Sequence, residues 1–204
     1  MLDENLLLDS ASRVSNHTNT DIGCPENTSA GVLYSWYVLR ATYSRELKVC
    51  EALERLGVRT FVPMMWKTST ADQGTSRKLV PAVSGLCFVY WSKSAIDSYI
   101  RSFGDTRPVN YYWDRIIGAP LTVPPKAMED FIAVTSTLDE GLIYLTEVSA
   151  KLREGQTVRV KDGPFKGVEG KIVRIRKSRR VLVELPGTLA VATTFVSPQE
   201  LEII

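Results

Sequence analysis

The sequence predicts two folded parts of different class: an α+β sandwich with helices against an antiparallel sheet, followed by a small all-β barrel. Residues 33–138 alternate strand-like and helix-like stretches in the order βα, several strands, α, β, α. Residues 151–204 hold five short apolar alternations separated by turns, which is typical of a barrel that limits exposed strand edges. We therefore divide the chain into a disordered polar leader (1–32), a first domain (33–138), a linker (139–150) and a barrel domain (151–204).

The first domain opens with an aromatic and β-branched strand at Tyr34–Leu39. Ser44 is placed to cap a helix that runs to Leu56 and ends at Gly57. The predicted buried stripe of this helix consists of Leu47, Cys50, Leu53 and Leu56. The next strands are expected at Arg59–Met64, in a hairpin of Trp66–Thr70 with Arg77–Val80, and at Leu86–Trp91.

The sequence of the rest of the first domain predicts two more helices and one strand. Ser94 is placed to cap a helix that carries Ile96, Tyr99, Ile100 and Phe103. A strand is expected at Val109–Trp113, and Pro125 suits the first turn of a third helix. That helix shows Met128, Phe131, Ile132 and Thr135 at helical spacing.

In the barrel domain, Val158 and Val160 alternate with polar residues, and Gly163-Pro164 marks a turn. Gly167 and Gly170 indicate a bulge or a close backbone approach. The remaining strands are expected at 172–175, 179–185, 189–195 and 201–204.

Charge and cysteine content bound the function classes. The net charge is +2, but residues 151–204 hold 11 Lys/Arg against 6 Asp/Glu, whereas residues 1–150 hold 14 against 17. A basic barrel suits an anionic partner, and a solvated basic face is the alternative. Cys24, Cys50 and Cys87 lie far apart, and the acidic N-terminus lacks a signal-peptide start, so we expect a reduced, cytoplasmic protein without membrane contact.

The start of the barrel domain resembles the KOW motif. The pattern that carries the resemblance is Gly155-x-x-Val158-x-Val160-x-x-Gly163-Pro164-Phe165-x-Gly167-x-x-Gly170. The alternative is an SH3-like barrel that is unrelated to KOW domains. Upstream, the chain resembles the N-terminal domain of the NusG family of transcription factors. The similar stretches are Trp36-Tyr37-Val38-Leu39-Arg40, Val83-Ser84-Gly85-Leu86-Cys87-Phe88-Val89, and Ile117 to Met128. The resemblance covers the chain from about Tyr34 to its end.

This resemblance implies a partner and sites. Family members grip the clamp helices of RNA polymerase with an apolar pocket, here Val83, Leu86 and Phe88 with Trp36 and Arg40 beside it. Arg45 and Lys48 correspond to the helix face that meets non-template DNA in specialised relatives. Gly163, Pro164 and Phe165 correspond to the surface that meets a ribosomal protein or the termination factor Rho. Core packing is the alternative for Val83 and Leu86, and a solvated face for Arg45 and Lys48. An aromatic on a Gly-Pro turn is poorly placed for the core, so packing over the barrel mouth is the alternative for Phe165.

The sequence departs from the family's Phe-Pro-Gly-Tyr signature, since Val83, Ser84 and Leu86 replace two aromatics and a proline. With its long polar leader, the chain resembles the specialised UpxY-type or RfaH-like members. The resemblance implies a monomeric, operon-specific antitermination factor of surface-polysaccharide operons. A general elongation factor and a ribosome-associated KOW protein that binds RNA are the alternatives.

An enzyme is not expected. The sequence contains no P-loop, GxSxG motif, Cys/His pairing or cluster at metal-ligand spacing, and the one histidine, His17, lies in the leader. We therefore expect no catalytic residues, no metal and no cofactor.

Overall fold

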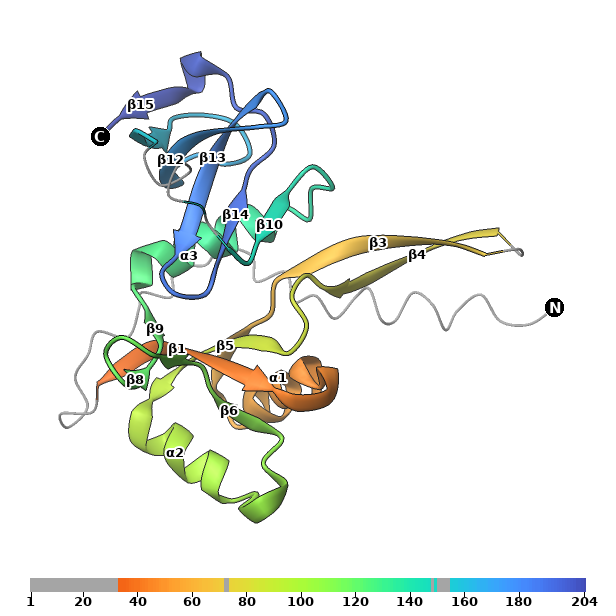
Figure 1. The fold of residues 1–204 in the computed structure, drawn as a ribbon, viewed down its shortest axis with the longest axis vertical. Helices are drawn as coiled ribbons and strands as arrows, with labels where there is room; N and C mark the ends of the chain where they lie inside the picture. The colour runs from red at the N-terminus through yellow and green to blue at the C-terminus, as the bar shows by residue number, and fades with distance from the viewer. Residues whose placement is uncertain (1–32, 72–73, 148, 150–154) are drawn as a thin grey trace. The chain divides into compact units, whose positions relative to one another are not determined.

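The structure is a computed structural model, and it describes residues 33–71, 74–147, 149 and 155–204 (Figure 1). The leader expected at residues 1–32 lies outside the described residues. Residues Tyr34–Ile204 form one compact unit. The predicted class, a mixed α/β part followed by an all-β part, is confirmed.

The first sheet has five strands, all paired antiparallel. Their order is β2–β5–β1–β6, and β9 also pairs with β1. The strands are β1 (Tyr34–Ala41), β2 (Arg59–Phe61), β5 (Leu86–Ser92), β6 (Val109–Tyr111) and β9 (Thr122–Val123). The interior position of β5 agrees with its sequence, which is apolar on both faces.

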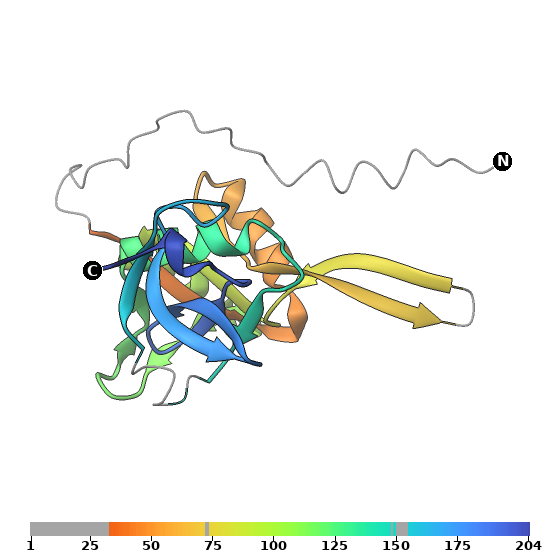
Figure 2. The same ribbon diagram turned by 90° about the horizontal axis from the view of Figure 1, so that it is seen from above.

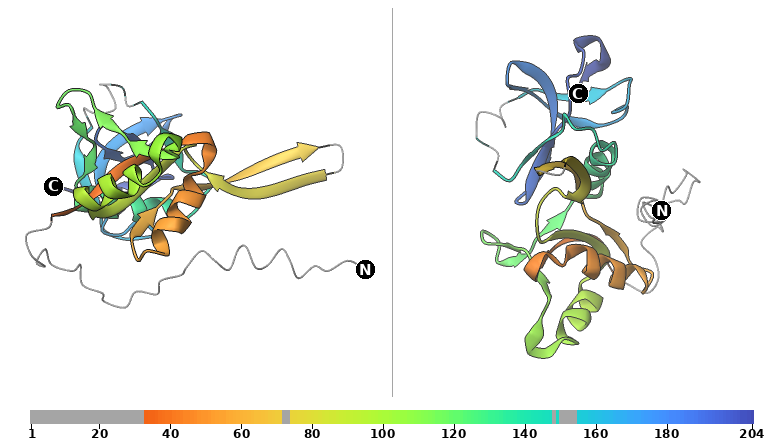
Figure 3. Two further views of the ribbon diagram at one scale, coloured as in Figure 1. Left: turned by 90° about the horizontal axis from the view of Figure 1, so that it is seen from below. Right: turned by 90° about the vertical axis from the view of Figure 1, so that its right-hand side faces the viewer.

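Helices cover both faces of this sheet, and Figure 3 shows α1 (Glu46–Glu54) and α2 (Lys93–Arg101) together on one of them. Tyr37 and Leu39 of β1 belong to the apolar cluster beneath these two helices. Trp36 and Val38 alternate with them and belong to the cluster of α3 (Pro125–Thr135) on the opposite face. Alternate side chains of β1 therefore pack into the two apolar clusters on opposite faces of the sheet.

Two helix starts differ from the sequence prediction. Ser92, and not Ser94, caps α2, because its Oγ accepts a hydrogen bond from the N–H of Ala95 at 3.3 Å. Ser44 does not cap α1 either. It ends the 3₁₀ turn η2 (Thr42–Ser44) with a left-handed φ of 50°, so the helix begins two residues later.

The buried stripe of α1 is also shifted from the prediction. Val49, Cys50 and Leu53 are buried, whereas the side chains of Leu47 and Leu56 are 48% and 62% exposed. Leu47 faces away from the sheet, and Leu56 lies beyond the last helical residue. The predicted turn at Gly57 is present, with a φ of 75°, but the helix itself ends at Glu54, two residues before the expected Leu56.

Two hairpins extend from the first domain. β3 (Met64–Ala71) pairs with β4 (Gly74–Pro81) as a long two-stranded ribbon, which is seen clearly in Figure 2. β7 (Trp113–Asp114) pairs with β8 (Ala119–Pro120). The strand expected at Val109–Trp113 is therefore divided between β6 and β7. A second 3₁₀ turn, η3 (Gly104–Thr106), follows α2.

The barrel sheet is antiparallel, with the strand order β10–β14–β13–β12–β11–β15. Its strands are β10 (Ile143–Leu145), β11 (Thr157–Val160), β12 (Glu169–Ile175), β13 (Ser178–Leu185), β14 (Leu189–Ala192) and β15 (Leu201–Ile203), with a 3₁₀ turn η4 (Pro198–Glu200). The five predicted strands are present. β10 is an addition, because it lies in the segment expected to be a linker and pairs with β14.

The glycines of the barrel act as the sequence indicates. Gly167 turns the chain through a φ of 86°. A Cβ on Gly170 would lie 2.5 Å from the carbonyl oxygen of Leu182, so the β12 backbone approaches β13 too closely for any side chain.

Candidate functional site

The expected polymerase-binding residues lie on the face of the first sheet that α3 covers. Trp36, Leu86 and Phe88 are 3%, 2% and 0% exposed. Phe88 packs against Phe131 of α3, with ring centroids 5.8 Å apart. These three side chains are therefore brought together as sequence reasoning expects, but as part of a closed apolar core in this conformation.

Arg40 and Val83 lie at the edge of the same face. Arg40 is paired in register with Leu86 and is exposed, and Val83 is half-buried against the core cluster. The turn that carries Val83 is fixed by Gly85, whose φ is 74° and whose Cβ would lie 2.8 Å from the carbonyl oxygen of Ala41. Of the five expected residues, Arg40 and Val83 are the ones that offer surface.

A row of aromatic side chains extends this face and was missed in the sequence. Tyr34 lies 6.0 Å from Tyr90, and Tyr90 lies 5.5 Å from Trp36, between ring centroids. The guanidinium of Arg59 stacks over Trp36 at 5.1 Å. The signal was available, because Tyr34 and Trp36 are two residues apart in a strand and so share a face.

The same apolar cluster includes residues of the barrel. α3 contacts β1 on one side and β13 and β14 on the other. Lys126 of α3 donates to the carbonyl oxygen of Gly167 at 3.2 Å and pairs with the buried Asp130 at 2.7 Å. Burial raises the pKa of the Asp130 carboxyl, and the hydrogen bond from Lys126 opposes this shift.

Arg45 and Lys48, the expected nucleic-acid residues, are both exposed at the start of α1. The guanidinium of Arg45 lies 5.6 Å from the ring centroid of Tyr43. Tyr43 is 87% exposed and has a left-handed φ of 56°, which is unusual for an aromatic residue. Sequence reasoning missed Tyr43, because its exposure depends on this local backbone.

The expected partner surface of the barrel requires a correction. Gly163 turns the chain with a φ of 84°, as a Gly-Pro turn predicts. Phe165, however, is only 3% exposed and packs in the cluster that contains Val158, Val160 and Val168. The view that an aromatic on this turn is poorly placed for the core is wrong, since the turn directs its ring inward.

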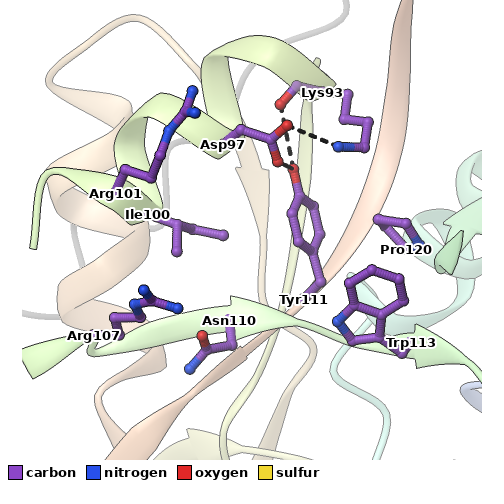
Figure 4. Close-up of a pocket in the computed structure, with 9 residues that line it drawn as sticks. All are labelled: Lys93, Asp97, Ile100, Arg101, Arg107, Asn110, Tyr111, Trp113 and Pro120. Carbon is purple, nitrogen blue, oxygen red and sulfur yellow. Dashed lines mark hydrogen bonds and ion pairs between the residues drawn. The ribbon is translucent and has the colours of Figure 1, made fainter. Parts of the chain in front are cut away.

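A polar pocket of about 290 Å³ lies between α2 and β6 (Figure 4). Asp97 accepts from Lys93 at 2.7 Å and from the Tyr111 hydroxyl at 2.9 Å. The hydrogen bond from Lys93 is the main reason that the pKa of Asp97 is lowered. Burial, followed by the bond to Asp97, raises the pKa of Tyr111. The negative charge of Asp97 is therefore already balanced by Lys93, and both of its oxygens already accept hydrogen bonds.

The remaining chemistry is sparse. Cys50 and Cys87 are buried free thiols, and the pKa of Cys87 is raised, first by its hydrogen bond with Cys50 and then by burial. Within the described ranges, no three His, Cys, Asp or Glu side chains come together as metal ligands would. None of the helices in the described part of the chain has the length and apolarity needed to cross a bilayer.

Two family models match the chain, one in each of its two parts. Residues 34–132 match the family model described as "Transcription termination factor nusG", and residues 154–184 match the model of the KOW motif. A solved structure titled "Domain interaction in Thermotoga maritima NusG" is 21% identical, with a TM-score of 0.43, over 84% of this chain and 98% of that one. No curated protein sequence matches the chain.

The fold and the two matches define a two-domain protein in which a mixed α/β domain precedes a KOW barrel. In chain order, a domain that matches the NusG model at residues 34–132 is followed by a KOW match at residues 154–184.

Proposed function

We propose that this chain is a specialised transcription antitermination factor that binds RNA polymerase and promotes processive elongation of particular operons, those for surface polysaccharides. The observation that carries the proposal is the NusG-type domain at residues 34–132 with an altered signature at Val83, Ser84 and Leu86. A ribosome-associated KOW protein would have no counterpart of this domain.

The proposed mechanism is differential binding and involves no catalysis. A factor that binds the elongating polymerase more tightly than the paused enzyme shifts the population toward elongation by the difference in affinity. The clamp helices of the polymerase would meet the edge formed by Arg40 and Val83. The aromatic row of Tyr34 and Tyr90 lies at the other end of the β1–β5 pair, so it would be a second apolar contact on the same face.

Two further contacts belong to the proposal. Arg45 and Lys48 would meet the phosphates of the non-template DNA strand, with Tyr43 beside them as an exposed ring for base stacking. The turn at Gly163 and Pro164 would meet a ribosomal protein or Rho, with Phe165 supporting the turn from within the core.

The test is co-purification of RNA polymerase from a host lysate with the wild type and with Val83→Glu. Val83 is half-buried at the edge, so the variant should fold and yet place a carboxylate in an apolar contact on binding. We expect a loss of at least about 2 kcal/mol, roughly 30-fold in Kd. Leu86→Glu is the contrasting variant, since Leu86 lies in the core and its substitution should unfold the first domain.

A matched control removes charge elsewhere. Arg45→Ala with Lys48→Ala should retain polymerase binding and weaken DNA-dependent recruitment, with a smaller salt dependence. Transcription through terminators placed behind candidate leaders then measures operon specificity. Full-strength polymerase binding by a folded Val83→Glu protein would contradict the proposed edge, and equal activity on every template would indicate a general elongation factor.

A further inference from the structure

Strands β12 and β13 form a hairpin of the barrel domain (Figure 1). Four cationic residues lie at and beside its turn. Arg174, Arg176 and Lys177 are exposed, and Arg179 is half-buried. Among the described residues, none of these four side chains forms an ion pair or a side-chain hydrogen bond. The group therefore has no ion-pair partner within the described part of the chain.

The strand pairing of the hairpin brings two of these cations together, which lowers the stability of the barrel. Arg174 and Arg179 are directly opposite each other across the two strands. Like charges in directly opposite positions destabilise an antiparallel pair, because their side chains lie on the same face a few ångströms apart. A sequence selected for barrel stability alone would place opposite charges or β-branched residues there.

The turn of the hairpin shows a second cost at the same place. Ile175 pairs with Ser178, so Arg176 and Lys177 are the two turn residues, and their φ values are 51° and 65°. Two successive left-handed residues make a type I′ turn, for which Asn-Gly is strongly preferred because L side chains are strained there. The chain instead has two cations in this strained turn.

We propose that the tip of the β12–β13 hairpin is a binding site for the phosphate backbone of double-stranded DNA. Both structural costs are explained if the four cations meet a row of phosphates, since arginine forks bind phosphate oxygens in pairs. A two-stranded ribbon also has the width to enter the major groove. The site is independent of the proposed polymerase-binding edge.

The composition of the hairpin favours a duplex over an unpaired strand. Residues 171–180 read KIVRIRKSRR and contain no aromatic side chain. Proteins that bind single strands stack the unpaired bases on aromatic rings, and this tip offers none. Recognition through charge alone suits a helix whose bases are already stacked and whose phosphates are regularly spaced.

The test uses the full chain and a 20-base-pair duplex, with fluorescence anisotropy at several salt concentrations. In Arg176→Asn with Lys177→Gly, two phosphate contacts are lost and the turn is relaxed. We expect about tenfold weaker binding and a salt slope reduced by about 1.8, at about 0.9 per phosphate. The same variant should melt at a higher temperature than the wild type. Weaker DNA binding together with a higher melting temperature would show that the two residues act in binding and do not stabilise the fold.

Lys161→Gln with Lys166→Gln is the matched control, because both lysines are exposed on the barrel and the net charge falls equally. It should bind the duplex within about twofold of the wild type. The proposal is overturned if the hairpin variant keeps the wild-type affinity and slope, or if the control loses as much. It is also overturned if the wild type prefers a single strand, an RNA hairpin or polyglutamate to the duplex. Polymerase co-purification of the hairpin variant should be unchanged, so failure here leaves the proposed function standing.

Discussion

Replacement of Phe165 by alanine should destabilise the barrel severely, and the size of the effect follows from burial. The ring is 3% exposed and lies in one cluster with Val158, Val160 and Val168. A buried phenylalanine removes at least about 150 Å² from water, which at about 25 cal/mol per Å² is about 4 kcal/mol. Large-to-small aromatic substitutions in cores cost about 3–5 kcal/mol, which is the same range.

Such a loss is comparable with the whole stability expected of a barrel this small. Urea denaturation followed by far-UV circular dichroism should show the Phe165→Ala transition at a much lower midpoint. All four tryptophans lie in the first domain, at positions 36, 66, 91 and 113, so their fluorescence reports that domain. Coincident shifts of both signals would mean that the two domains unfold together, as their shared apolar cluster favours.

The control is Phe165→Leu, which keeps most of the side-chain volume and should cost less than about 1.5 kcal/mol. The reasoning is refuted if Phe165→Ala leaves the dichroism midpoint of the full chain unchanged. In that case the ring contributes no core packing, and its expected role as a partner-binding surface would regain support.

Two further predictions concern α2. Ser92→Ala should cost about 1 kcal/mol by removing the cap on the N–H of Ala95, whereas Ser94→Ala should change stability by less than about 0.5 kcal/mol in thermal melts. The pKa of Asp97 is lowered below its ordinary value near 3.8, so its stabilising contribution is present above that pH and is lost as the pH falls through its folded-state pKa. Asp97→Asn should therefore flatten the acid limb of stability against pH, and an unchanged limb would show that the bond from Lys93 contributes nothing measurable.

Local sequence signals predicted the barrel well because its strands are built from local patterns. The alternation of Val158 with Val160 and the glycine at position 170 specify faces and close approaches between neighbouring strands. β10 had no such signal. Its three residues become a strand only by pairing with β14, some 45 residues further on, and sequence patterns do not show long-range partners of so short a segment.

The site was harder to predict, because an apolar pattern is the same for a buried core and for an open pocket. Leu86 and Phe88 match the expected positions, but whether they have surface depends on α3, which packs over them from 40 residues away. Phe165 shows the converse error. A turn residue is usually exposed, and only the backbone of this turn decides that its ring faces inward.

The candidate sites contain two kinds of residue, which differ in how their substitution changes the stability of the fold. Leu86 and Phe165 stabilise the fold, so any loss of binding on substitution is inseparable from loss of structure. Arg176 and Lys177 are strained in the fold, and Arg174 faces Arg179, so their replacement should raise stability while it lowers affinity. Opposite signs in the two measurements cannot arise from unfolding. Cations that the barrel would be more stable without are therefore the sharpest indication in this chain of selection for binding.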